Sequence, residues 1–277
     1  MLYFARDSGK ILHGCQAEEI EKNYSEEPGE SFKDNLYNRV YNEREWCPGY
    51  EIGDTSIQYK LNKRGYRAPE FEELDYTKYR IACYGCSYTF GVGVKNEDTW
   101  PEQLRASQEI PNGAQIWNLG LPGASNDLIT RYIVNTAAVI QPHIMFVQWT
   151  IPHRREWVDG DGRIKKILTN HPKFWMDNTN AYRSFMTLSN EKWDDYCFEK
   201  NLTLIRLLCE LHGVILISSH IQHFPMEESA RDNVHPGKKD HKAFAKLMFN
   251  NLVDETVFPD NRDIVKERYG NIDSEQS

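Results

Sequence analysis

Three stretches that are far apart in the sequence carry side chains suited to nucleophilic attack on a carbonyl carbon. In the first, Ser87 follows Gly85 and Cys86 where an apolar, strand-like run must turn into a helix. A serine at such a turn projects into the crevice beyond the sheet, where its backbone N–H can stabilise an oxyanion. A serine before a helix also commonly serves as an N-cap, which is the simpler structural interpretation of Ser87.

The second stretch is a glycine-rich loop, NLGLPGASN, from Asn118 to Asn126. Its glycines allow close approach of the backbone, so the N–H of Gly123 could point at the same oxyanion. The plainer interpretation is a Gly/Pro turn before a helix that has Ser125 as its N-cap. Taken alone, the loop favours this plainer interpretation.

The third stretch, DNVHPG, places Asp232 three residues before His235. A carboxylate at this spacing can orient an imidazole and stabilise its protonated form, which leaves the other ring nitrogen free to take a proton from Ser87. An unperturbed histidine titrates near pH 6.5, so it needs little tuning to act as a base at neutral pH. Taken alone, the pair is more typical of an exposed surface turn.

Alternating strands and helices predict where these stretches meet. We expect strands at RIACYG, QIWNLG, HIMFVQW and GVILISS, and helices over 99–108, 125–140, about 191–212 and 238–252. Short apolar runs alternating with helices are typical of a parallel sheet covered on both faces. The sequence therefore predicts a three-layer α/β/α domain with about five parallel strands. Ligands of such sheets bind beyond the carboxyl ends of the strands.

Composition and organisation limit the possible functions. The chain has 277 residues and a net charge of -8, which disfavours nucleic acid as a partner. Its apolar runs are too short to span a membrane. Charged residues near the start argue against a signal peptide, so we expect a cytoplasmic protein. Residues 1–78 are predicted to form an N-terminal extension with a short strand near 56–61. The main domain over 79–277 contains an insertion at 153–190 with a hairpin turn at 159–162.

Two other groups of residues have weaker functional interpretations. Cys83 and Cys86 form a single C-x-x-C without a second pair, and we interpret them as two cysteines beside a turn. Cys86 is also a less favoured candidate nucleophile. His220 and His223 have H-x-x-H spacing, but no carboxylate or thiolate follows at a matching distance, so neither a metal site nor a cofactor is expected.

Together the three stretches resemble the SGNH/GDSL hydrolase family over about residues 79–252. YGCSYTFGVGV…TWPEQL resembles the family's nucleophile block, and NLGLPGAS resembles the block that supplies an oxyanion-hole N–H, here from Gly123. DNVHPG resembles the block that carries the catalytic Asp and His. LNKRGYRAPEF, at 61–71, resembles a stretch that precedes the nucleophile block in many bacterial and phage members. The resemblance implies a flavodoxin-like fold and a triad of Ser87, Asp232 and His235.

The sequence departs from the family pattern at two positions. Cys86 stands where the family usually has Asp before the nucleophile. The third strand continues as VQWTIPHRRE and lacks the usual Asn that donates to the oxyanion. Thr150 or Arg154 could supply a substitute donor, and Asn126 at the end of the glycine-rich loop is a further candidate for binding substrate. Losing one such donor costs about 10²–10³ in rate in known cases.

The resemblance implies a serine ester hydrolase that acts on short acyl esters, lipids or O-acetylated carbohydrates. Two alternatives stay open, the first because of these departures and the second because of the tyrosine-rich N-terminal segment. One is a degenerate family member that binds a glycan or a protein without turnover. The other is an assembly protein of a larger particle, associated with a virion if the chain is of phage origin. The acyl group, the alcohol and the oligomeric state are not predicted.

Overall fold

The computed structural model describes residues 58–105, 110–158, 164–167, 190–230 and 235–253, together with the short strand at 32–33 and the single positions 180, 184 and 187. Asp232, the predicted acid of the triad, lies outside the described residues. Most of the predicted N-terminal extension and most of the 153–190 insertion also lie outside them.

The central feature of the described chain is a parallel sheet of four strands. In sequence order these are β3 (Arg80–Gly85), β4 (Gln115–Gly120), β5 (Ile144–Trp149) and β8 (Ile215–His220). Their order in the sheet is β4-β3-β5-β8, and every pairing is parallel. The strands form from continuous apolar runs because both faces of the sheet are buried.

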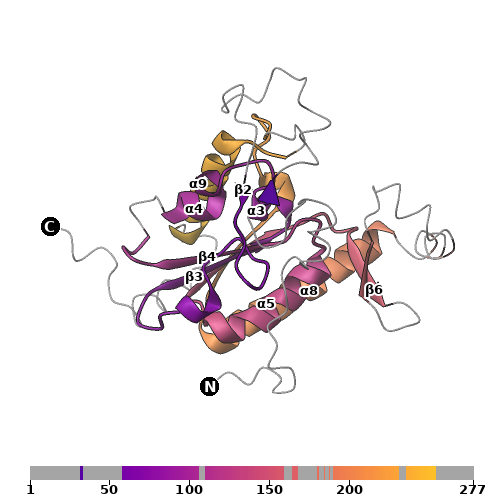
Figure 1. Cartoon of the computed structure of the whole chain (residues 1–277). Coiled ribbons are helices and arrows are strands. Elements are labelled where there is room, and N and C mark those ends of the chain that lie inside the picture. The colour runs from indigo at the N-terminus through magenta and orange to yellow at the C-terminus, as the bar shows by residue number, and fades with distance from the viewer. Residues whose placement is uncertain are drawn as a thin grey trace.

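Helices cover both faces of this sheet (Figure 1). On one face lie α5 (Asn126–Ile140) and α8 (Glu191–His212), and on the other lie α4 (Trp100–Arg105) and α9 (Lys238–Val253). The four-residue helix α3 (Ser87–Phe90) follows directly after β3.

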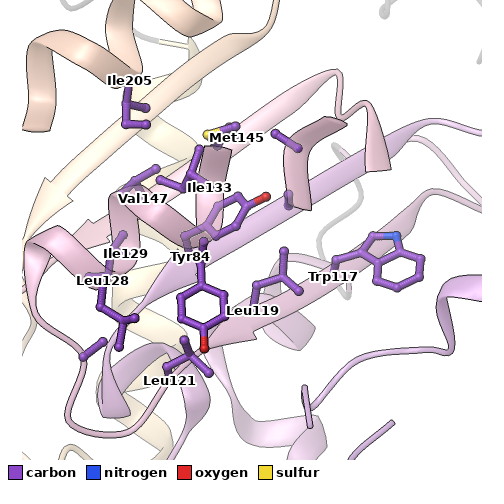
Figure 2. Packing of buried hydrophobic residues seen from close by; sticks show 14 of the residues in the cluster. Tyr84, Trp117, Leu119, Leu121, Leu128, Ile129, Ile133, Met145, Val147 and Ile205 are labelled. Carbon is purple, nitrogen blue, oxygen red and sulfur yellow. The ribbon is translucent and has the colours of Figure 1, made fainter. Parts of the chain in front are cut away.

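Successive residues of the strands supply two separate hydrophobic cores, because side chains along a strand alternate between faces. In β3, Ala82 and Tyr84 join the core under α5 and α8, whereas Ile81 and Cys83 join the core under α4 and α9. Figure 2 shows the first core, where Tyr84, Leu119 and Val147 of the sheet lie among side chains of α5 and α8.

The ends of the long helices follow from local capping chemistry. Ser125 accepts a hydrogen bond from the N–H of Leu128 and caps α5. Asn190 caps α8 in the same way, and Gly213 ends α8 in a left-handed conformation that glycine adopts without strain. The predicted helices over 125–140, 191–212 and 238–252 are therefore confirmed to within a residue.

The predicted fold class is confirmed, with one difference in strand number. The parallel sheet and its two helical layers match the expected three-layer α/β/α architecture, and the strand order follows the flavodoxin-like rule. We expected about five strands, and the described residues contribute four to this sheet. Residues 254–277 lie outside the described part of the chain.

Two small antiparallel pairs accompany the sheet. Strands β6 (Arg155–Val158) and β7 (Ile164–Ile167) pair across the segment 159–163, which confirms the hairpin predicted there, although the turn itself is not described. Strands β1 (Phe32–Lys33) and β2 (Gln58–Tyr59) form the other pair. None of the described helices is long and apolar enough to cross a lipid bilayer.

The last part of the predicted N-terminal extension packs against the domain. Tyr66 is fully buried and, with Phe71, belongs to the core under α5 and α8. Its ring makes edge contacts with Phe71 and with Tyr132 of α5. Tyr66 and Phe71 therefore pack into the core of the main domain. The domain boundary at residue 78 stays a prediction.

Candidate active site

The site is built where β3 and β4 end side by side. Gly85 pairs with Gly120, and the N–H of Leu121 donates to the carbonyl oxygen of Gly85 across 3.0 Å. A Cβ atom on Gly120 would lie 2.2 Å from the backbone nitrogen of Phe90, so only glycine lets β4 approach α3 this closely. This contact fixes the start of α3 against the sheet.

Ser87 is the first residue of α3 and is 7% exposed at the carboxyl edge of the sheet. Its carbonyl oxygen accepts hydrogen bonds from the N–H groups of Gly91 and Val92. Within the described part of the chain, neither the backbone N–H of Ser87 nor that of Gly123 donates a hydrogen bond to another backbone group.

Arg67 holds the loop that follows α3. Its guanidinium donates to the carbonyl oxygens of Phe90, Gly91 and Val94 at 3.1, 2.8 and 3.0 Å. The side chain is buried and also stacks over the rings of Tyr59 and Phe90. Three charge-assisted bonds to one short loop make Arg67 the main clamp on the end of α3.

A buried polar network lies beneath the turn at Ser87. The Oε1 atom of Gln148 in β5 accepts from the Thr89 hydroxyl at 3.1 Å and from the Cys86 thiol at 3.6 Å. The Thr89 hydroxyl in turn accepts from the indole N–H of Trp100. Cys86 thus occupies the position before Ser87 as a hydrogen-bonded, buried thiol that points toward β5.

His235 lies against the turn that carries Ser87. Its ring packs edge-to-face on the ring of Tyr88, with the two centroids 5.5 Å apart, and Tyr88 also contacts Phe224. The structure therefore brings the predicted base next to the residue that follows Ser87, although 148 positions separate His235 from Ser87 in the sequence. The position of Asp232 is not described.

The loop that carries His235 has firmly anchored ends. The N–H of Ala230 donates to the carbonyl of His235 at 2.7 Å, and Ser229 forms an antiparallel bridge with Pro236. Both carboxylate oxygens of Asp240, in the first turn of α9, accept backbone N–H groups at the start of the loop. The base of the loop is thereby fixed to α9.

His241 is a buried histidine behind the site. Its Nδ1 accepts from the backbone N–H of Trp100 at 3.1 Å, so the neutral ring carries its proton on Nε2. Burial lowers the pKa of His241 from 6.5 to about 3, and the charges of Arg67 and His235 act in the same direction. His241 is therefore neutral in the folded protein and supports the site as a fixed hydrogen-bond acceptor.

The other predicted site residues meet at the end of β5. Asn126 exchanges two hydrogen bonds with the backbone of Thr150, at 2.9 and 3.1 Å. The Thr150 hydroxyl accepts from Arg154 at 3.2 Å, and the Nε of Arg154 is buried without a partner among the described residues. Asn126 and Thr150 are both fully buried. The amide of Asn126 therefore holds the start of α5 against the end of β5. Arg154 retains an unused donor.

The histidines that the sequence suggested as weak metal ligands are used for local structure. The Nδ1 of His220 accepts from the N–H of Gln222, and His223 hydrogen-bonds with Ser219. Burial lowers the pKa of His220, with His223 contributing in the same direction. In the described portion of the chain, no three His, Cys, Asp or Glu residues come together in a way that could hold a metal ion.

Sequence reasoning did not identify the supporting roles of Gln148, Arg67 and His241. Gln148 could have been noticed, because it is the single polar residue in the strand IMFVQW and a buried amide needs partners. Arg67 lies in a motif that was singled out, RGYRAP, but nothing in that motif indicates its contact with Phe90. His241 carries no local signal, because its partner Trp100 lies 141 positions away.

Comparisons with known proteins give matches among solved structures only. No protein-family model matches the sequence, and no curated protein matches it. A member of the lipolytic protein G-D-S-L family from Veillonella parvula is 18% identical, with 66% of this chain and 99% of that chain covered and a TM-score of 0.31. The acetyl xylan esterase AlAXEase is 14% identical over 63% and 100% of the two chains, with a TM-score of 0.34.

A third similar structure is LAE5, an alpha/beta hydrolase enzyme from the metagenome of Lake Arreo, Spain. It is 17% identical, the alignment covers 62% of this chain and 93% of that chain, and the TM-score is 0.32. Because these TM-scores are all below 0.5, the function has to be argued from the site itself.

Proposed function

We propose that the protein is a serine ester hydrolase of the SGNH/GDSL type, with Ser87 as nucleophile, His235 as general base and Asp232 as the residue that orients His235. The observation that carries this proposal is the 5.5 Å contact between the rings of His235 and Tyr88. It places an imidazole beside the turn that begins α3, at the edge of the sheet where such folds bind ligands.

The reaction proceeds in two acyl-transfer steps. His235 takes the proton of the Ser87 hydroxyl while the oxygen attacks the ester carbonyl, and the same proton then passes to the departing alcohol. Water, deprotonated by His235, attacks the acyl-serine, and the carboxylic acid leaves as Ser87 recovers its proton. The buried turn at Ser87 supports this chemistry because Arg67 and the bonds to the Ser87 carbonyl fix the backbone that carries the hydroxyl.

The proposed oxyanion site consists of the N–H groups of Ser87 and Gly123, with Arg154 as the third donor. Gly123 has a positive φ of 69°, which turns the loop sharply before α5. Arg154 substitutes for the family's asparagine better than Thr150 does, because Thr150 is fully buried and already contacts Arg154. The substrate class that fits is a short acyl ester, including acetyl groups on carbohydrates.

Labelling with a fluorophosphonate probe tests the assignment of Ser87. We expect stoichiometric labelling of the wild type, no labelling of Ser87→Ala, and a rate of p-nitrophenyl acetate hydrolysis lowered about 10²–10⁴-fold in His235→Asn. Cys86→Ala is the matched control, because Cys86 is the adjacent candidate nucleophile and its loss should leave labelling in place. Equal labelling of the wild type and Ser87→Ala would rule out the mechanism.

The end of β5 favours a second candidate, a protein of the same fold that binds a glycan without hydrolysing it. There the usual asparagine is absent, and the amide of Asn126 is occupied by the backbone of Thr150. Turnover of any acetyl, butyryl or acetyl-sugar ester that requires Ser87 decides for the hydrolase. Retention of a glycan on an array by protein inert toward all of these esters decides for the binding protein.

A further inference from the structure

Helix α8 carries an exposed apolar stripe along its length. Trp193, Tyr196, Leu204, Leu207 and Leu211 are 47–79% exposed. With 3.6 residues per turn, these five positions fall within an arc of about 80° on the helix surface. The opposite side of α8 is already used, since Leu202, Ile205 and Cys209 pack into the core under α5 and α8. Among the described residues, no member of the stripe belongs to a hydrophobic core.

The spacing of the stripe is symmetric about position 202. Trp193 and Leu211 lie equally far from that centre, and the midpoint of Tyr196 and Leu207 is half a residue away. The counterpart of Leu204 is Lys200, which lies in the same arc but is not apolar at its tip. In an antiparallel pair of identical helices related by a two-fold axis, residue i faces residue j and residue j faces residue i. The apolar residues near both ends of the stripe can therefore face one another in a pair of copies.

We infer that α8 is the interface of a homodimer in which two copies of α8 pack antiparallel, centred on residue 202. Trp193 and Tyr196, whose rings stack 5.6 Å apart, contact Leu211 and Leu207 of the second copy. Large aromatic anchors of this kind supply most of the binding energy in protein interfaces. Lys200 faces Leu204 of the second copy with its apolar stem and keeps its ammonium in water.

The charged residues beside the stripe fit the same antiparallel pairing centred on residue 202. Lys192 and Glu210 both flank the stripe on the side away from the domain, and the antiparallel pairing sets Lys192 opposite Glu210 of the second copy. Glu199 and Arg206 are opposed in the same way, farther from the stripe. A parallel pairing about a two-fold axis would instead place the two Lys192 side chains on opposite sides of the interface, where neither faces Glu210. The charge pattern thus fits the antiparallel arrangement, in which Lys192 and Glu210 attract each other.

The start of α8 is already fixed for such a contact. Asn190 caps the helix, and Arg155 of β6 donates to Asp194 at 2.6 Å and to the carbonyl of Trp193. The apolar anchors therefore belong to a helix that needs no ordering on association, which reduces the entropic cost of binding. A contact between two helices is near the small end of specific interfaces, so the dimer should dissociate on dilution in the micromolar range.

Sedimentation equilibrium of the full chain across the micromolar range tests the inference. We expect the wild type to dimerise, Leu207→Glu to raise the dissociation constant at least about tenfold, and Asp195→Lys, on another side of α8, to leave the constant unchanged. Circular dichroism verifies that each variant is folded. The inference is overturned if the wild type stays monomeric. This includes the case in which another segment of the same chain covers the stripe.

Charge reversal tests the register. Lys192→Glu and Glu210→Lys should each weaken the dimer, and the double variant should restore it, because the two residues face each other across the two-fold axis. A dimer that Leu207→Glu disrupts but that the double reversal does not restore would overturn the antiparallel register. A dimer insensitive to Leu207→Glu would overturn the interface itself.

Discussion

The buried imidazole of His241 makes the stability of the folded protein depend on pH. In the unfolded chain this histidine binds a proton below about pH 6.5, whereas in the folded protein its pKa is about 3. Between these values the unfolded state holds more protons, so the free energy of unfolding falls as the pH falls through this window. The slope from this one group is at most about 1.4 kcal/mol per pH unit.

Replacement of His241 by Asn should remove this dependence. The Oδ1 atom of asparagine can accept the N–H of Trp100, and the side chain does not titrate. We expect a lower stability than the wild type at pH 7 but a shallower decline between pH 6.5 and 4, measured by urea unfolding. His223→Asn, at an exposed position on the same edge of the sheet, is the control and should keep the steep decline. Identical slopes for His241→Asn and the wild type would contradict the prediction.

At the scale of the elements, α3 depends on a contact from outside the sheet. Arg67→Leu removes the donors to the carbonyl oxygens of Phe90, Gly91 and Val94, which remain buried. A hydrogen bond to a charged group contributes about 1.5–3 kcal/mol, so we expect a loss of at least about 3 kcal/mol in the free energy of unfolding. Because the end of α3 is released, labelling of Ser87 by a fluorophosphonate should also slow.

Arg64→Leu is the matched control for this variant, since Arg64 is a half-exposed arginine three residues earlier in the same loop. It should change the stability by less than about 0.5 kcal/mol, as surface substitutions usually do. If Arg67→Leu unfolds at the same urea concentration as Arg64→Leu, the clamp on α3 is not a stabilising contact.

Local signals in the sequence were enough to predict the bounds of α8 but not the contacts of Arg67. The bounds of α8 and β4 were predicted because helical spacing in α8 and a short apolar run in β4 are both local signals. The clamp from Arg67 to Gly91 and the bond from Thr89 to Gln148 join residues 24 and 59 positions apart. Such contacts arise from the packing of elements, and no local pattern encodes them. The meeting of His235 with Tyr88 was predictable only through the three motifs taken together.

At the scale of the whole molecule, the two cores cannot be lost separately. Each strand of the sheet contributes to both, as β3 does through Cys83 on one face and Tyr84 on the other. Exposing either core therefore requires the strands to separate, which exposes the second core as well. This arrangement predicts one cooperative transition for the described domain.

Two buried thiols on opposite faces of the sheet provide the test. Burial raises the pKa of Cys83 well above its ordinary value and that of Cys209 to about 12, so neither thiol reacts as a thiolate in the folded protein. Under pulsed alkylation in increasing urea, followed by peptide mass spectrometry, both should become reactive at the same urea concentration. If Cys209 reacts at a clearly lower concentration than Cys83, the α5–α8 layer opens independently, and the shared strands do not couple the two faces.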